Sequence, residues 1–133
     1  MSENVAVSGL ALSRSCEEAV AAYRDSGKSI QSPAIRKLLE SVITQKREHV
    51  EALRAFDAQF TGVSPRIAIP ASSDPEAVLK SLVDHESAFA KALDELSASV
   101  AAEEPRLKVK SMADAGRKFA SWATDHLDLL ALF

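Results

Sequence analysis

Four ionisable side chains fall at positions where helical spacing predicts an apolar, buried surface. They are Lys46, His49, Glu86 and His126. Imidazole and carboxylate groups bind transition-metal ions, whereas an ammonium group in an apolar core requires a carboxylate partner, because an isolated buried charge is strongly destabilising. The pattern therefore predicts either a metal site or an ion pair inside a helical protein.

Amphipathic helices are predicted to carry these side chains, because apolar residues recur at spacings of three and four and alanine and leucine are abundant. Ser32-Pro33 and Asp74-Pro75 each place a capping residue before a proline at the first helical position, and Ser26-Gly27 predicts a stop. We expect one all-α domain over residues 1–133. The predicted helices span about 9–25, 33–60, 75–101 and 106–132.

A long connection, residues 61–74, separates the second predicted helix from the third. Fully extended, it would reach roughly 46 Å, and the second helix would be about 42 Å long. The connection can therefore cross the whole length of a bundle. This predicts two antiparallel helical hairpins joined by one long crossover, with Val63, Ile67 and Ile69 packing against the bundle.

An internal repeat supports two related hairpins. A shift of 77 positions aligns residues 48–56 with residues 125–133, and a shift of 69 aligns residues 17–21 with residues 86–90. The histidines of the first pair of segments fall at matching places. Together the two alignments indicate a duplicated hairpin.

The arrangement resembles the ferritin-like superfamily, in particular its rubrerythrin-like members, over nearly the whole chain and through pattern rather than strong motifs. The resemblance implies a ferritin-like four-helix bundle. In that family the first and third helices each supply a Glu, and the second and fourth each supply Glu-x-x-His, which together bind two iron or manganese ions. Carried over by position, Glu17 (or Glu18) and Glu86 match the single glutamates, and His49 and His126 match the histidines.

The chain departs from this family pattern at both bridging glutamates, because Lys46 and Ala123 stand at those positions. Bridging carboxylates offset much of the charge of two dications, and a fixed ammonium repels a dication where the dielectric is low. We therefore expect no ordinary di-iron site. Lys46 is expected to pair with Glu86 and Glu17, which would define helix register more than it adds net stability.

A surviving metal site is the main alternative. Glu17, His49, Glu86 and His126 would then hold iron, manganese or zinc in a di-metal carboxylate protein that handles iron or peroxide. A mononuclear zinc or iron site would instead combine the three histidines with Glu86, although no two histidines have the i, i+4 spacing typical of such sites. The third histidine, His85, is adjacent to Glu86, so on a helix its side chain points about 100° away from that of Glu86. His85 is therefore predicted at the edge of the core. Nothing in the sequence indicates a haem pocket.

Other candidate residues have structural explanations. Cys16 lies on the apolar stripe of its helix and is predicted to be a small buried hydrophobe rather than a reactive thiol. Trp122 is predicted at the edge of the core. The sequence contains no Ser-His-Asp order, P-loop, glycine-rich dinucleotide turn or CxxC, so enzyme activity is not expected.

Composition limits the partners and the location. A single cysteine and an amino-terminal segment without a basic region before an apolar stretch predict a cytoplasmic protein, and no apolar run approaches the roughly 20 residues of a membrane span. The net charge of -3 and scattered Lys and Arg argue against nucleic-acid binding. We expect a non-enzymatic structural or interaction protein, pairing as a homodimer, or alternatively a helical adaptor or inhibitor of another bacterial protein.

Overall fold

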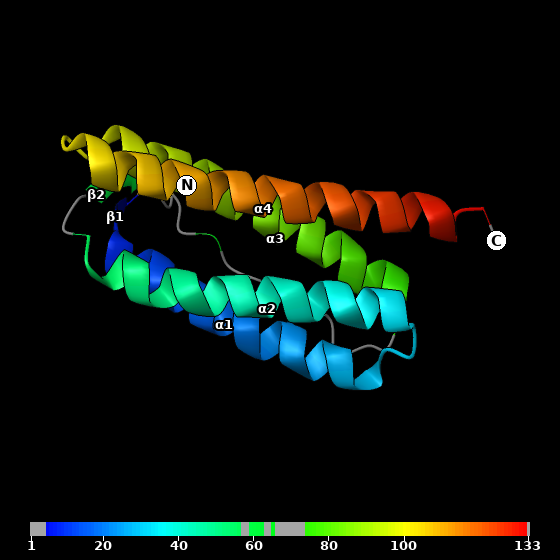
Figure 1. Ribbon diagram of the computed structural model, residues 1–133. Helices are drawn as coiled ribbons and strands as arrows, with labels where there is room; N and C mark the ends of the chain where they lie inside the picture. Colours follow the sequence, from blue (N-terminus) through cyan, green and yellow to red (C-terminus); the bar gives the residue numbers. More distant parts are fainter. Residues whose placement is uncertain (1–4, 57–58, 63–64, 66–73, 133) are drawn as a thin grey trace.

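The computed structural model describes residues 5–56, 59–62, 65 and 74–132 (Figure 1). Over these residues the chain forms four helices and one antiparallel two-stranded sheet. The all-α class predicted from the sequence is confirmed, with the small sheet as an addition. The elements are β1 (Val5–Ser8), α1 (Gly9–Ser29), α2 (Pro33–Arg54), β2 (Gln59–Gly62), α3 (Pro75–Ala98) and α4 (Glu103–Leu130).

The first three helices begin at side-chain caps. The Ser8 hydroxyl accepts a hydrogen bond from the Ala11 amide at 3.2 Å, and the Ser32 hydroxyl accepts one from the Ile35 amide at 3.4 Å. The Asp74 carboxylate accepts one from the Glu76 amide at 3.1 Å. Each cap satisfies an amide that has no partner within the helix, so the starts of α2 and α3 follow from short local signals.

The helix ends differ more from the sequence-based expectation. The second helix ends at Arg54 rather than near Phe60, because residues 59–62 form β2 and pair antiparallel with β1, with Val7 opposite Phe60. Both of these side chains are buried, so the pairing adds to the core. The first helix continues past Ser26-Gly27 to Ser29, since Gly27 does not take up the positive φ that ends a helix.

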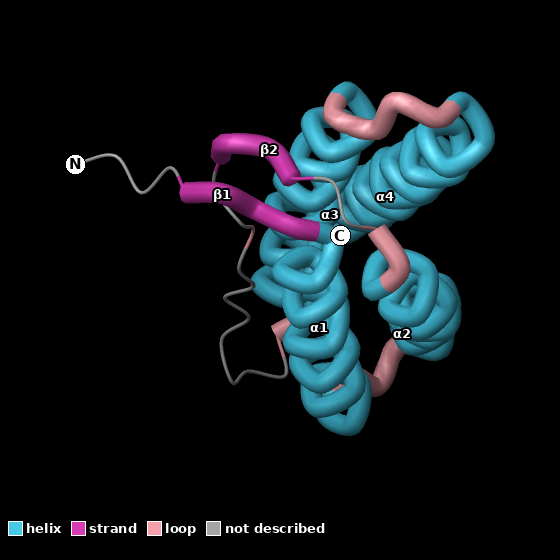
Figure 2. The backbone as a smooth tube through the Cα atoms, turned by 90° about the vertical axis from the view of Figure 1, so that its left-hand side faces the viewer, coloured by secondary structure: helices cyan, strands magenta, loops and turns pink. Residues whose placement is uncertain are grey.

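The helices form two antiparallel hairpins, α1 with α2 and α3 with α4, and α2 runs in the same direction as α3 (Figure 1). The carboxyl end of α2 and the amino end of α3 therefore lie at opposite ends of the bundle. Most of the predicted crossover, including Val63, Ile67 and Ile69, lies outside the described residues; at its described point, the Pro65 carbonyl accepts a hydrogen bond from the Ser15 hydroxyl at 2.9 Å. Figure 2 shows the sheet beside α1 and α3, at the end of the bundle where α2 stops.

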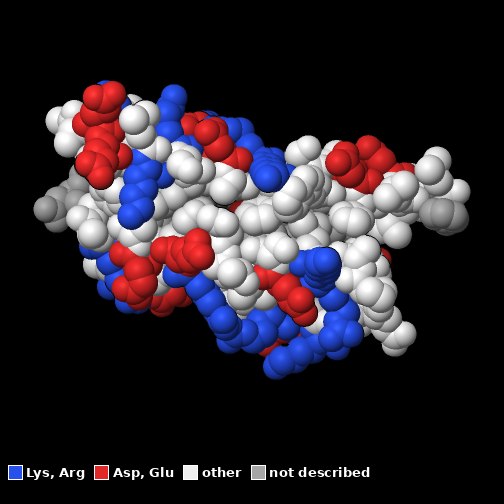
Figure 3. Space-filling view, in the orientation of Figure 1, with Lys and Arg blue, Asp and Glu red and all other residues white. Residues whose placement is uncertain are grey.

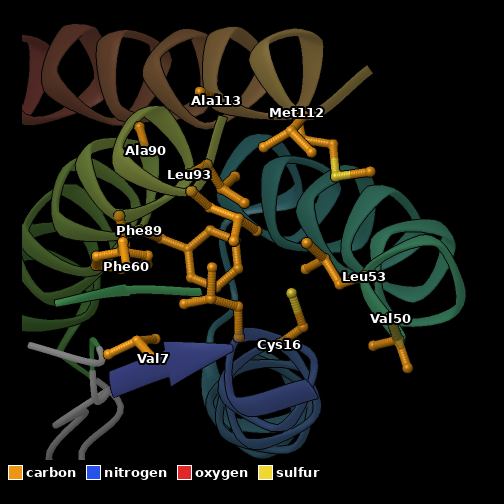
Figure 4. Close-up of a cluster of buried hydrophobic side chains, with 14 residues drawn as sticks. Val7, Cys16, Val50, Leu53, Phe60, Phe89, Ala90, Leu93, Met112 and Ala113 are labelled. Carbon is orange, nitrogen blue, oxygen red and sulfur yellow. The ribbon is translucent and has the colours of Figure 1, made fainter. Parts of the chain in front are cut away.

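The core consists of two apolar clusters, one toward each end of the bundle. The cluster next to the sheet, drawn in Figure 4, includes Val7, Leu12, Cys16, Val50, Leu53, Phe60, Phe89, Leu93 and Met112. The other cluster includes Ala19, Tyr23, Leu39, Val42, Leu79, Leu82, Phe119 and Ala123. Along α2 and α3, the boundary between the two clusters falls at Lys46 and Glu86. A polar layer therefore divides the core.

Candidate functional site

The centre of the polar layer is an ion pair between α2 and α3. The Lys46 ammonium Nζ lies 3.2 Å from the Glu86 carboxylate Oε2, and each side chain is only 2% exposed. The Tyr23 hydroxyl, from α1, donates a hydrogen bond of 2.8 Å to the same oxygen. Lys46 Nζ also lies 4.0 Å from the centroid of the Phe89 ring, a cation–π contact. The structure thus brings together Lys46 and Glu86, as the sequence led us to expect, and adds Tyr23.

Burial determines the protonation of Tyr23. Removal from water raises the pKa of its hydroxyl well above the usual value, and the negative charge of Glu86 raises it further. The phenol therefore keeps its proton at every physiological pH and acts as a hydrogen-bond donor. With one ammonium and one hydroxyl directed at Glu86, its carboxylate is neutralised by groups of the protein itself.

His85 also lies in this layer, which corrects the prediction that it sits at the edge of the core. It is 3% exposed, and its Nε2 is 3.8 Å from Glu86 Oε2. Its ring centroid lies 6.3 Å from that of Tyr23 and 5.7 Å from that of Phe89. The reason is that α3 is covered by α4 on one side and by α1 and β2 on another, so its buried arc is wide enough to include two adjacent residues.

The fourth helix contributes close backbone contact instead of a polar side chain. A Cβ added at Gly116 would lie 3.3 Å from the Glu86 carbonyl oxygen and 3.5 Å from the Ala90 Cβ. Glycine therefore lets α4 approach α3 directly beside the polar layer. Ala123, which stands where the family pattern has a bridging glutamate, is fully buried in the apolar cluster on the far side of Gly116 from the sheet.

His49 lies one turn from Lys46 on α2 and is 8% exposed. Its Nε2 is 3.2 Å from the Gln45 amide nitrogen, a contact in which the ring nitrogen accepts the hydrogen bond. Burial, and then the charge of Lys46, lower the pKa of His49 to about 4. The imidazole is therefore neutral at physiological pH.

Glu17 and Glu18 do not face the core, contrary to the family-based assignment. Both are exposed, and the Glu17 carboxylate pairs with the Arg54 guanidinium on the surface between α1 and α2. The core-facing position of α1 is the neighbouring Cys16, which is fully buried. Adjacent residues on a helix point about 100° apart, so a shift of one residue is enough to direct the carboxylate into solvent.

His126 lies far from His49 along the bundle. Each histidine is within about one and a half turns of the carboxyl end of its helix, α2 at Arg54 and α4 at Leu130. Figure 1 shows that these two ends are at opposite ends of the molecule. The helices α2 and α4 run in opposite directions, so equivalent positions of the repeat lie side by side only near the middle of the two helices. His49 and His126 are both near a carboxyl end, and they therefore lie apart.

The residues do not fit a dinuclear metal centre. Of the four proposed ligands, Glu17 is on the surface, His126 is half-buried at the far end of α4, and Glu86 is held by Lys46. Within the described part of the chain, no group of three or more His, Cys, Asp or Glu side chains is arranged to hold a metal ion. The ammonium of Lys46 would repel a cation placed beside Glu86.

Cys16 behaves as a buried apolar residue. Its side chain points into the cluster of Figure 4, and burial raises the pKa of the thiol to about 11. The thiol is therefore protonated at neutral pH. Trp122, in contrast, is 40% exposed, with its ring edge-on to Phe119 at 5.6 Å.

Two residues of the site were missed by sequence reasoning, Tyr23 and Gln45. Tyr23 is the single tyrosine and falls on an apolar stripe, where a buried hydroxyl needs a hydrogen-bond partner. Glu86 is a carboxylate predicted on the buried face of another helix, so the need of the Tyr23 hydroxyl for a partner could have indicated a Tyr23–Glu86 hydrogen bond. Gln45 lies one turn before His49, a spacing at which side chains on a helix meet.

No protein-family model, no curated protein and no solved structure matches the chain. The resemblance to ferritin-like proteins therefore rests on the order of the helices and on the internal repeat.

The ion pair predicts a non-additive response to mutation. Lys46→Met or Glu86→Gln alone should lower the free energy of unfolding by about 3 to 5 kcal/mol, because each leaves one buried charge unpaired. The double variant removes both charges and keeps an acceptor for Tyr23, so it should lose clearly less than the sum. Urea unfolding followed by circular dichroism measures this, and strictly additive losses would contradict it. The exposed pair Lys80–Glu76, at 2.9 Å, is the matched control, where the same substitutions should leave the free energy of unfolding nearly unchanged.

The neutral, buried state of His49 predicts a dependence of stability on pH. Its pKa is about 4 in the folded protein and 6.5 in a model peptide, so between these values the unfolded chain binds more protons. Its contribution to stability is therefore fully present above pH 6.5 and declines as the pH falls toward 4, with a slope of up to about 1 kcal/mol per pH unit. Urea unfolding of the wild type and of His49→Gln at several pH values in this range measures the effect. Parallel curves for the two proteins would show that His49 is not responsible.

Proposed function

We propose that the protein is a ferritin-like four-helix bundle in which an ion-paired polar layer replaces the dinuclear metal centre, and that it acts as a structural or interaction protein. The observation that carries this proposal is the Lys46 ammonium, 3.2 Å from Glu86 inside the core. Position 46 is where the family pattern has a bridging glutamate. A positive charge there disfavours a bound dication and satisfies the remaining carboxylate without one.

The helix directions support the ferritin-like part of the proposal. Two antiparallel hairpins with α2 and α3 running the same way are the arrangement of four-helix bundles that contain one long crossover. The polar layer lies between two apolar clusters in the middle of the bundle, which is the level at which such bundles hold cofactors. In this chain the same level serves to join the hairpins.

The interaction part of the proposal rests on the carboxyl end of α4. Large apolar side chains are exposed there, and α4 extends beyond the start of α3 in Figure 1. Grouped exposed apolar residues mark contact surfaces. We assign this surface to a homodimer contact, because Lys118 and Asp128 flank it with opposite charges that an antiparallel pair of α4 helices would bring together. The exposed residues are Trp122, Leu129, Leu130 and Leu132.

We propose a cytoplasmic location, which is consistent with the single cysteine. We also propose that neither a membrane nor a nucleic acid is a binding partner, because the basic residues are scattered along the chain. Within the described residues, no helix combines the length and the apolar character of a bilayer span. An adaptor or inhibitor acting on a different protein through the same α4 surface is the alternative partner arrangement.

Metal loading tests the first part of the proposal. The purified protein is incubated with excess Fe(II) under anaerobic conditions, or with Mn(II) or Zn(II), then desalted and measured by inductively coupled plasma mass spectrometry. We expect substoichiometric metal and an unchanged thermal unfolding temperature, because the buried carboxylate of Glu86 is already paired with the Lys46 ammonium. Two tightly bound ions per chain, with a raised unfolding temperature, would overturn the proposal.

Oligomeric state tests the second part. We expect the wild type to sediment as a reversible dimer and Leu129→Lys/Leu132→Lys to sediment as a monomer with the same circular dichroism spectrum. Leu107→Lys is the control, since Leu107 is 53% exposed on the opposite end of α4 and should not affect association. Analytical ultracentrifugation distinguishes the outcomes, and a wild type that stays monomeric into the millimolar range would refute the homodimer.

A further inference from the structure

A surface hollow lies at the sheet end of the bundle, between the last turns of α2 and the connection from α3 to α4. Its volume is about 860 Å³. Pockets of roughly 300 to 1,000 Å³ are the size that accepts an organic molecule of moderate size. The hollow is separate from the polar layer, since neither Lys46 nor Glu86 lines it.

The walls of the hollow are mainly apolar. Ala52 and Phe56 contribute from the end of α2, and Val100 and Pro105 contribute from the opposite side. All four are half-buried, so they offer apolar surface to a ligand while remaining packed against the protein. Covering such a surface is favourable in proportion to the apolar area removed from water.

The rim of the hollow is acidic. Glu48 and Glu51 line it on the α2 side and Glu104 on the α4 side, against one cation, Lys108. Figure 3, which views this face, shows acidic side chains in an upper and a lower group at the left end of the molecule, with a basic side chain and uncharged surface between them. Glu51 already pairs with Arg54 at 3.1 Å, so Glu48 on the α2 side and Glu104 on the α4 side are the lining carboxylates that we consider for a ligand.

Two helix ends add to this negative potential. The residues that cap the carboxyl ends of α2 and α3, Ala55 and Ser99, both line the hollow. A helix carries partial negative charge at its carboxyl end, so both ends favour a cation in the same space. The amino end of α4, with its cap residue Ala102, also lines the hollow and carries partial positive charge, which offsets one of these two carboxyl ends. The other carboxyl end and the acidic rim still favour a cation over an anion.

We propose that this hollow binds an amphipathic organic cation, with its apolar body against Phe56 and Val100 and its ammonium group between Glu48 and Glu104. The proposed homodimer surface is not a suitable occupant, because the end of α4 carries acidic side chains at Asp125 and Asp128. A small hydrophilic cation would leave the apolar walls uncovered. The site goes beyond the proposed structural role and is independent of it.

The test uses three probes that share one apolar body and differ in charge: 4-phenylbutylammonium, 4-phenylbutanol and 4-phenylbutyrate. Each is titrated into the ¹⁵N-labelled full chain at pH 7 and followed by amide chemical shifts. We expect saturable shifts at residues of the hollow, with the ammonium binding about threefold to tenfold more tightly than the alcohol and the carboxylate binding most weakly. Equal affinities for the three probes, or shifts that do not saturate or lie elsewhere, would overturn the proposal.

Variants separate the two halves of the site. Glu48→Gln/Glu104→Gln should lower the affinity for the ammonium to that of the alcohol while leaving the alcohol unaffected, because both side chains are exposed and the walls stay intact. Val100→Ser should weaken all three probes. Glu18→Gln, an exposed change on α1 outside the hollow, is the matched control and should change nothing. An unchanged affinity of the ammonium for the double Gln variant would contradict the charge argument whatever the metal and oligomer measurements show.

Discussion

The ion pair between Lys46 and Glu86 joins the two helical hairpins across the interior of the bundle. Removing two charges from water is costly, and the cost is recovered only while ammonium and carboxylate stay in contact. The relative position of α2 and α3 is therefore constrained, since sliding by one helical turn would leave both charges buried without partners. Tyr23 extends the constraint to α1 through its hydrogen bond, and Gly116 extends it to α4 through backbone proximity.

The protonation states of the side chains near this ion pair follow from the same exclusion of water. Burial keeps the Tyr23 hydroxyl protonated and the His49 imidazole neutral beside the Lys46–Glu86 pair, and it keeps the Cys16 thiol protonated in the adjoining apolar cluster. Such an arrangement suits register and specificity of packing better than acid–base or metal chemistry. The apolar clusters on either side then supply most of the stabilisation through buried area.

The sequence predicts features of the fold that depend on local signals. The starts of α2 and α3 follow from a cap residue before a proline, and the buried positions of Lys46 and Glu86 follow from helical periodicity. The β1–β2 pairing could not be predicted in this way, because it joins segments on opposite sides of a whole hairpin and appears as no pattern in either one.

The candidate site shows a similar division. Choosing between Cys16 and Glu17 as the inward-facing residue requires an orientation known to better than 100°, which periodicity does not provide. His49 and His126 match in the repeat, yet the antiparallel course of α2 and α4 carries them apart. The aromatic ring of Tyr23 fits the apolar stripe of α1, so the residue is easily taken for an ordinary core residue. Only its hydroxyl, which donates a hydrogen bond to Glu86, makes it part of the polar layer.

The small sheet has a consequence for the order of folding. Because β1 precedes α1 and β2 follows α2, their pairing joins the two ends of the first hairpin. Each hairpin brings together helices that are neighbours in the chain. Contacts between such neighbours form quickly, because closing a short loop has a small entropy cost. The contact between Lys46 and Glu86, however, forms only when the two hairpins meet. The charged pair therefore becomes fully buried only when the first hairpin, joined at its ends by the sheet, packs against the second.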